Sequence, residues 1–285
     1  MIENKNDHIQ KYLDYYTSLN IAPGFAILLR GEWGCGKSWF MKKYIADDER
    51  YIYVSLNGIS TIQEINEDIF RQLHPVLGSK GMKIAGKILK GLIKTTIKVD
   101  FGHEQATINP TIPDLDLLEQ FKKIENKILI FDDLERCSIP IHNTLGYINQ
   151  FVESNELKVI LIANETEIIK LELIQENTLN KYTHIKEKLI GKSFNIASDF
   201  TNAIQSFLQD IQTDDVRKIL NDRVNIIHGI FESAKYNNLR HLRLAILDFE
   251  RFSIYLPDDC YSKTEFIDHT IKLFFILSFE FTTVR

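Results

Sequence analysis

Cysteine is scarce in this chain, and its scarcity argues against two kinds of cross-linked protein. The chain has three cysteines among 285 residues, at Cys35, Cys137 and Cys260. They are odd in number, widely spaced and not arranged as metal ligands usually are, so the sequence predicts neither a disulfide framework nor a zinc site. Such a pattern is typical of proteins in a reducing compartment, and we expect a cytoplasmic protein.

Long apolar runs and a strong excess of one charge are also missing. No stretch approaches the roughly 18 uncharged apolar residues that a membrane-spanning helix needs, and the first residues lack the apolar core of a secretory signal. The most apolar run, residues 273–281, is short and contains Glu280, so we expect a buried helix there. The formal net charge is -5, so the overall electrostatics give no indication of a nucleic-acid partner.

The chain does contain enough apolar residues to bury a sizeable core. Hydrophobic residues make up 44% of the sequence and charged residues 26%, which is typical of a soluble globular protein. A length of 285 residues exceeds the usual size of a single domain core. We therefore expect a large α/β domain with a smaller appendage.

Short apolar runs of strand length alternate with helical patterns over the first two thirds of the chain. The expected strands are residues 25–29, 51–56, 128–131, 158–164 and 193–196, and the expected helices are residues 8–19, 39–45, 62–73, 115–124 and 145–152. This alternation predicts an α/β fold with a parallel sheet covered by helices on both faces. After residue 199 only helical patterns remain. We expect an α/β domain at 1–198, with an insertion at 78–113, and an α-helical lid domain at 199–285.

A glycine-rich loop lies between the first expected strand and the helix after it. Its pattern is Gly31, four residues, and then Gly36-Lys37-Ser38, which is typical of loops that bind nucleoside phosphates through backbone N–H groups. We expect Lys37 to reach the β- and γ-phosphates and Ser38 to ligate Mg²⁺. The alternative is an ordinary glycine turn. The expected nucleotide contacts are Gly31, Glu32, Trp33, Gly34, Cys35, Gly36, Lys37, Ser38 and Trp39.

The same loop predicts an unusual cysteine. Cys35 lies between the loop N–H groups and the Lys37 ammonium group, which together make the local potential positive. A positive potential stabilises a thiolate, so we expect Cys35 to have some thiolate character.

Two adjacent carboxylates end the strand at 128–131. Asp132 is placed to hold the magnesium ion, while Asp133 is placed to orient or deprotonate an attacking water. This pair favours hydrolysis over nucleotide binding alone. The alternative for either residue is a helix cap, a role that aspartate fills well.

The glycine-rich loop and the acidic pair together resemble one known family, the KAP P-loop NTPases, which are close to the AAA+ and STAND ATPases. The resemblance rests on Gly-Glu-Trp-Gly-Cys-Gly-Lys-Ser at 31–38 and on Ile-Phe-Asp-Asp-Leu-Glu-Arg-Cys at 130–137. The second segment is similar to the family's Asp-Asp-Leu-Asp-Arg-Cys signature. The resemblance covers roughly residues 25–250 and implies a parallel five-stranded sheet of order 5-1-4-3-2, with ATP and Mg²⁺ as cofactors.

Two more site residues follow from the resemblance. Asn164, at the tip of its strand, would be a polar sensor that contacts the γ-phosphate or the water, and the alternative is an asparagine that ends a strand in a turn. Residues 238–243 resemble the family's Asn-Pro-Arg stretch, so Arg240 would reach the phosphates from the helical lid. Leu239 stands in place of the proline, which leaves Arg243 and a solvated helix face as alternatives.

Lysines recur every three or four residues within the expected insertion. This spacing places them within about a quarter of the circumference of a helix, with apolar residues on the remainder, and predicts a basic amphipathic helix. Many members of the resembled family carry transmembrane helices between the same two motifs, and this chain departs from that pattern. The apolar face would pack on its own core, or the helix would contact a membrane surface or a partner protein. The lysines are Lys80, Lys83, Lys87, Lys90, Lys94 and Lys98.

These features together predict an ATP hydrolase that acts as a conformational switch, in which nucleotide closes the helical lid over the loop. The resemblance suggests a role in bacterial, antiphage defence or signalling, with a homo-oligomer or an effector protein as partner. Arg136 offers either an arginine finger for a neighbouring subunit or an internal salt bridge. The alternatives are a scaffold that binds nucleotide without hydrolysis, and a small-molecule phosphotransferase. GTP is disfavoured because no Asn-Lys-x-Asp base-reading motif occurs.

Overall fold

The computed structural model describes residues 5–73, 127–174, 178–235 and 237–283, which form two compact units. We call Ile9–Arg30 with Ser38–Asn195 the sheet unit. We call Met1–His8, Gly31–Lys37 and Ile196–Arg285 the helical unit. The expected insertion, its lysine stripe and the expected helix at 115–124 lie outside the described residues. The domain limits at 1–198 and 199–285 stay a prediction.

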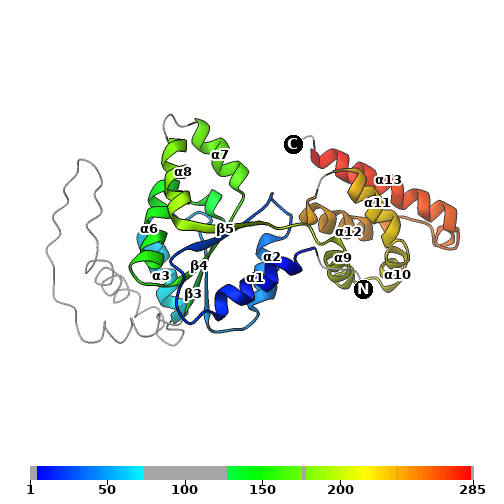
Figure 1. The fold of residues 1–285 in the computed structure, drawn as a ribbon. Helices are drawn as coiled ribbons and strands as arrows, with labels where there is room; N and C mark the ends of the chain where they lie inside the picture. The colour runs from blue at the N-terminus through cyan, green and yellow to red at the C-terminus, as the bar shows by residue number, and fades with distance from the viewer. Residues whose placement is uncertain (1–4, 74–126, 175–177, 236, 284–285) are drawn as a thin grey trace. The chain divides into compact units, whose positions relative to one another are not determined.

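A parallel five-stranded sheet forms the centre of the sheet unit (Figure 1). Its order is β2-β3-β4-β1-β5 and every pairing is parallel, so the predicted order 5-1-4-3-2 is confirmed. The strands in the middle are buried on both faces, and such strands have apolar residues along their whole length. The bounds are β1 Ala26–Arg30, β2 Tyr51–Ser55, β3 Ile128–Asp132, β4 Lys158–Ala163 and β5 Ile190–Asn195.

The last strand begins earlier than the sequence predicted. We expected residues 193–196, whereas β5 starts at Ile190. Gly191 and Lys192 are exposed in it, because β5 lies at the edge of the sheet and pairs with β1 alone among the described strands. An edge strand tolerates polar residues, so the first half of β5 has no apolar run by which the sequence could identify it.

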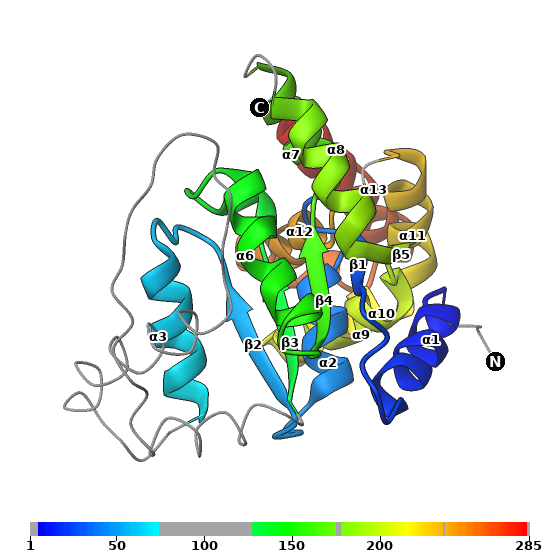
Figure 2. The same ribbon diagram turned by 60° about the vertical axis from the view of Figure 1, so that its left-hand side comes forward.

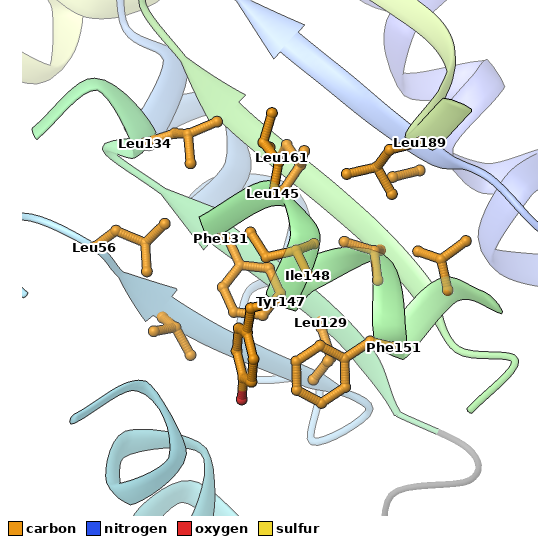
Figure 3. Packing of buried hydrophobic residues seen from close by; sticks show 14 of the residues in the cluster. Leu56, Leu129, Phe131, Leu134, Leu145, Tyr147, Ile148, Phe151, Leu161 and Leu189 are labelled. Atoms are coloured by element: carbon orange, nitrogen blue, oxygen red, sulfur yellow. The ribbon is translucent and has the colours of Figure 1, made fainter. Parts of the chain in front are cut away.

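Helices cover both faces of the sheet, as predicted (Figures 1 and 2). On one face, α3 (Ile62–Leu73), α6 (Ile141–Glu153) and α8 (Thr178–Leu189) pack on the strands, and α7 (Glu165–Ile174) packs on α8. The opposite face carries α1 (Asp7–Ser18) and α2 (Lys37–Ile45). Figure 3 shows how β3 and α6 meet, with Phe131 close to Phe151 (6.0 Å between ring centroids) and Tyr147 edge-on to Phe151 (5.1 Å).

The helical unit has a hydrophobic core of its own. Buried aromatic residues such as Phe231, Phe249 and Phe275 lie at its centre. The Asn6 side chain joins the N-terminal segment to this unit, because it donates to the Ala197 carbonyl (2.9 Å) and accepts from the Ala197 N–H (3.0 Å). The helices are α9 Phe200–Gln209, α10 Asp214–Asp222, α11 Val224–Ser233, α12 Leu239–Ser253 and α13 Thr264–Thr283.

The apolar run at 273–281 belongs to α13, and the expectation of a buried helix holds for one of its faces. Ile271, Phe275 and Phe279 are buried, whereas Leu273 is 60% exposed and Leu277 is 44% exposed. No helix in the described part of the chain is long and apolar enough to cross a membrane.

A group of charged and polar residues joins the carboxyl ends of three strands in the sheet unit. The Arg30 guanidinium, at the end of β1, donates to Asn195 Oδ1 at the end of β5 (2.6 Å) and to Glu165 Oε2 just after β4 (3.0 Å). The buried Glu165 carboxylate also accepts from Tyr182 (2.9 Å) and from Lys186. Burial alone would raise the pKa of Glu165, but Lys186, Arg30 and Tyr182 together hold it below its ordinary value of 4.5.

This group gives a prediction for stability against pH. Because the pKa of Glu165 is lowered in the folded protein, its contribution is present above pH 4.5 and is lost as the pH falls through the folded pKa. We expect Glu165→Gln to lower the free energy of unfolding at pH 7 by about 1–3 kcal/mol, since the substitution breaks a largely buried ion pair. Urea unfolding followed from pH 7 downwards measures this, and the difference from wild type should shrink below pH 4.5.

Glu153→Gln is the matched control for this prediction. Glu153 pairs with Lys188 at 2.9 Å, but the two side chains are 43% and 64% exposed, so the pair contributes less than about 1 kcal/mol. Equal losses in the two variants, or a Glu165→Gln loss that does not change with pH, would contradict the assigned role of Glu165.

Candidate functional site

The glycine-rich loop at residues 31–36 follows β1 in the chain and, together with Lys37 at the start of α2, belongs to the helical unit. Gly34 and Gly36 adopt positive φ angles of 79° and 101°, a conformation that costs glycine little. Lys37 is 8% exposed, and its ammonium group donates to the carbonyls of Gly31 (2.6 Å) and Glu32 (3.0 Å). Glu32 and Trp33 are exposed. The loop is therefore tightly curled, with the lysine folded back over it.

Asn238 fits against this loop. Its Oδ1 accepts from the N–H groups of Arg240 (3.0 Å) and His241 (3.3 Å), so it caps the start of α12. The next residue, Leu239, donates its N–H to the Gly34 carbonyl (2.8 Å). A Cβ atom added at Gly34 would lie 1.9 Å from Asn238 Oδ1. Gly34 is therefore required by its backbone angle and also by the space that Asn238 fills.

Cys35 does not have the thiolate character that we expected. The residue is 5% exposed, and burial raises the pKa of its thiol, which outweighs the lowering effect of the Lys37 charge. The positive potential of the loop favours the thiolate, but burial of the side chain disfavours it more strongly.

In the sheet unit, Asp132 is the last residue of β3 and is 1% exposed. Its Oδ1 accepts from the Asp133 N–H (2.7 Å), and its Oδ2 accepts from the Tyr53 hydroxyl. Burial raises the pKa of Asp132; the hydroxyls of Ser38 and Tyr53 offset part of this effect, and the Asp133 carboxylate adds to it. Each oxygen of the buried carboxylate therefore has one donor among the described residues and keeps a lone pair for a further partner.

Asp133 has a different environment. Its backbone is left-handed, with φ 58° and ψ 39°, and its side chain is 29% exposed. It precedes the short 3-10 helix η1 (Leu134–Arg136) but makes no side-chain capping hydrogen bond, so the helix-cap alternative does not apply. Instead, Oδ2 accepts from the Ser55 hydroxyl (3.0 Å), and Oδ1 lies 3.8 Å from Arg136 Nε. Arg136 therefore forms the internal salt bridge that was one of its two alternatives.

Asn164 follows β4 and is 4% exposed. Its N–H donates to Glu135 Oε2 (2.9 Å), which connects it to the turn after β3. Its side-chain Oδ1 is buried and accepts no hydrogen bond from any described residue. A buried amide oxygen without a donor is costly, so the arrangement fits a ligand or water that donates to it.

The two arginines left open by the sequence differ in the structure. Arg243 forms a two-point ion pair with Asp210 Oδ2 (3.0 and 2.8 Å). Arg240 lies in the first turn of α12, beside the cap residue Asn238, and is exposed. Within the described residues no carboxylate pairs with Arg240, which favours it over Arg243 as the residue available to a phosphate.

The residues of the sheet unit suit a magnesium ion. Mg²⁺ prefers oxygen ligands and keeps several waters, and Ser38 and Asp132 supply a hydroxyl and a carboxylate near each other. No cluster of three or more His, Cys, Asp or Glu residues that could hold a metal ion occurs in the part of the chain that the structure describes. Bound nucleotide phosphates would therefore supply further ligands.

Sequence reasoning missed several residues that contact the predicted site. Tyr53 and Ser55 were taken only as parts of a strand, and Glu135 only as part of a family signature. Each is polar and lies at or near the carboxyl end of a strand, where parallel sheets gather their ligands, and that position was the available signal.

The contact of Gly34 with Asn238 gives a prediction with a close control. Gly34→Ala should lower the free energy of unfolding by about 2 kcal/mol, because the new methyl group strains the backbone and displaces the α12 cap. Gly58→Ala has the same backbone cost, at φ 77°, but no atom within 4 Å of the new Cβ, so it should lose only about 1 kcal/mol. Urea unfolding of both variants measures the difference.

Amide hydrogen exchange tests the cause of that difference. In Gly34→Ala the N–H groups of Arg240 and His241 should exchange faster than in wild type, because the displaced Asn238 no longer accepts their hydrogen bonds. Equal stability of the two alanine variants, or unchanged exchange at α12, would show that Asn238 does not restrict position 34.

Comparison with known proteins agrees with this geometry. The model of the KAP family P-loop domain matches residues 5–256, which is most of the chain. A search of curated proteins finds no match. The sheet order, the loop after β1 and the carboxylate at the end of β3 are what a nucleotide-binding fold of this kind requires. The chain therefore belongs to the KAP family of P-loop NTPases.

Proposed function

We propose that the chain hydrolyses ATP in a magnesium-dependent reaction and uses the cycle as a conformational switch. The observation that carries the proposal is the contrast between two adjacent carboxylates. Asp132 is buried and accepts from the Tyr53 hydroxyl, whereas Asp133 is partly open to solvent and has a left-handed backbone. Neighbouring acids in such different environments suit different roles, one toward a metal and one toward water.

The loop residues bind and orient the phosphates in this proposal. Backbone N–H groups of the loop surround the anion, and Lys37 turns from the loop carbonyls toward the β- and γ-phosphates. Ser38 and Asp132 would hold the magnesium ion, which when bound offsets the negative charge that develops on the phosphate oxygens. Arg240, exposed in the first turn of α12, would add a second positive charge at the phosphates.

Asp133 and Asn164 act on the attacking water. Asp133 Oδ1 and Oδ2 accept hydrogen bonds, so the carboxylate orients the water and receives its proton. Asn164 Oδ1 is a buried acceptor, and an acceptor pairs with a water hydrogen rather than with a phosphate oxygen. This favours the water over the γ-phosphate as the partner of that atom.

We further propose that the switch acts in the cytoplasm, in bacterial defence or signalling, with copies of itself or with an effector protein. Family membership supports this role, and the conformational change would be carried by the contact of α12 with the loop through Asn238 and Leu239. The loop and α12 both belong to the helical unit, so a change at the phosphates would pass from one to the other within that unit.

Changing Asp132 to asparagine and changing Asp133 to asparagine should have different effects on Mg-ATP binding and on turnover. Asp132→Asn removes a charge from the magnesium ligands, so the affinity for Mg-ATP and the turnover should both fall. Asp133→Asn keeps those ligands but loses the proton acceptor, so binding should survive while turnover falls by about two to four orders of magnitude. Equilibrium dialysis and phosphate release on the same preparations measure both quantities.

Asp248→Asn, at a site 61% exposed and 3.9 Å from Arg251, is the control and should change neither quantity. An Asp133→Asn protein with wild-type turnover would refute the catalytic role of that residue. A wild-type protein that binds Mg-ATP and releases no phosphate would instead support the scaffold alternative.

A further inference from the structure

The strand next to the acidic pair carries two hydroxyl groups that contact it. Tyr53 and Ser55 are two residues apart in β2, so they lie on the same face of the sheet. β2 pairs with β3 in a register that sets Ser55 opposite Asp132 and Tyr53 opposite Ile130. The Tyr53 hydroxyl donates to Asp132 and the Ser55 hydroxyl donates to Asp133. Each acid therefore has its own hydroxyl from β2.

Among the described residues, Ser55 is one of two whose side chains contact the Asp133 carboxylate. Asp133 lies one residue beyond β3, and its backbone is left-handed. The hydrogen bond from Ser55 to Oδ2 at 3.0 Å and the approach of Arg136 to Oδ1 at 3.8 Å contact different oxygens of the carboxylate. Two contacts on two oxygens limit the rotation of the side chain.

We propose that Ser55 is a positioning residue for catalysis, which fixes the Asp133 carboxylate in the orientation that receives the proton of water. The inference rests on the proposed hydrolysis of ATP. In this proposal Ser55 contacts neither the phosphate nor the attacking water. Its hydroxyl uses its single proton on Oδ2, which leaves the remaining lone pairs of the carboxylate for water. A misplacement of about 1 Å in such a group can cost up to about 100-fold in rate.

Tyr53 provides an internal comparison on the same strand. Its hydroxyl donates to the buried Asp132, the acid proposed for the magnesium site. Loss of the Tyr53 hydroxyl should therefore alter how ATP binding depends on Mg²⁺, whereas loss of the Ser55 hydroxyl should alter turnover. The two hydroxyls are close in space but act through different acids.

The experiment compares Ser55→Ala with Ser55→Thr in the full chain. Steady-state phosphate release should show a kcat about tenfold lower in Ser55→Ala with KM within about twofold of wild type, because binding does not involve Asp133. Ser55→Thr keeps the hydroxyl and should restore most of kcat. Ser154→Ala, at an exposed serine after α6, is the control and should match wild type.

Two further measurements connect each hydroxyl to its acid. Ser55→Ala should cause no additional loss in an Asp133→Asn background, since both changes remove the same interaction. Equilibrium dialysis of ATP at increasing Mg²⁺ should show a higher half-saturating Mg²⁺ for Tyr53→Phe, with Tyr51→Phe unchanged. Tyr51 lies on the same face of β2, two residues before Tyr53, so it controls for the loss of a tyrosine hydroxyl.

Several outcomes would overturn the inference, and they can be told apart from failure of the proposed function. If Asp133→Asn abolishes turnover but Ser55→Ala does not change it, the function stands and the role of Ser55 is wrong. If Ser55→Ala lowers kcat by the same factor in wild type and in the Asp133→Asn background, the inference is also wrong. The same holds if Ser55→Thr does not restore kcat. A wild-type protein that releases no phosphate would overturn the proposed function and the inference with it.

Discussion

A carboxylate buried at the end of a buried strand has to be surrounded by hydrogen-bond donors, and much of the site follows from this requirement at Asp132. A charged group that is 1% exposed would be strongly destabilising without partners. The donors are the Tyr53 hydroxyl in β2 and the N–H of Asp133, and the Ser38 hydroxyl at the start of α2 also lowers the pKa of Asp132. The hydrogen bonds to one acid therefore connect β3 to the neighbouring strand and to the following turn.

All strands of a parallel sheet end at the same edge, so side chains at their carboxyl ends can contact one another. Arg30 ends β1 and immediately precedes the glycine-rich loop, and its contacts with Asn195 and Glu165 tie β1 to the ends of β5 and β4. Glu135 ties the turn after β3 to Asn164 after β4. The segments that carry the proposed catalytic residues are thus joined to one another by side chains that carry out no chemistry themselves.

The parts of the fold that the sequence predicted well are those in which one local pattern has one physical cause. β1 and β3 are covered on both faces, so their continuous apolar runs identified them, and the short spacing of glycines with Lys37 identified the loop. β5 was placed late because an edge strand tolerates exposed Gly191 and Lys192. The family resemblance, rather than periodicity, supplied the order of the strands.

The contacts around the site were beyond prediction because they join residues far apart in the chain. Tyr53 and Asp132 are separated by 79 positions, and Ser55 and Asp133 by 78, so no local pattern connects them. The packing of Asn238 against Gly34 is of the same kind. Cys35 was misjudged because burial, which opposes the thiolate, cannot be read from charge alone. The roles of the individual site residues stay predictions.

The left-handed backbone at Asp133 restricts which amino acids could serve at that position. Outside glycine, this conformation is tolerated best by aspartate and asparagine, whose short polar side chains interact with the nearby backbone. Glycine has no functional group and asparagine has no charge, whereas glutamate has the charge on a longer side chain that suits this backbone less well. For the role proposed for Asp133, backbone geometry and chemistry therefore favour the same side chain, and the short side chain of aspartate would require the water to lie close to the turn.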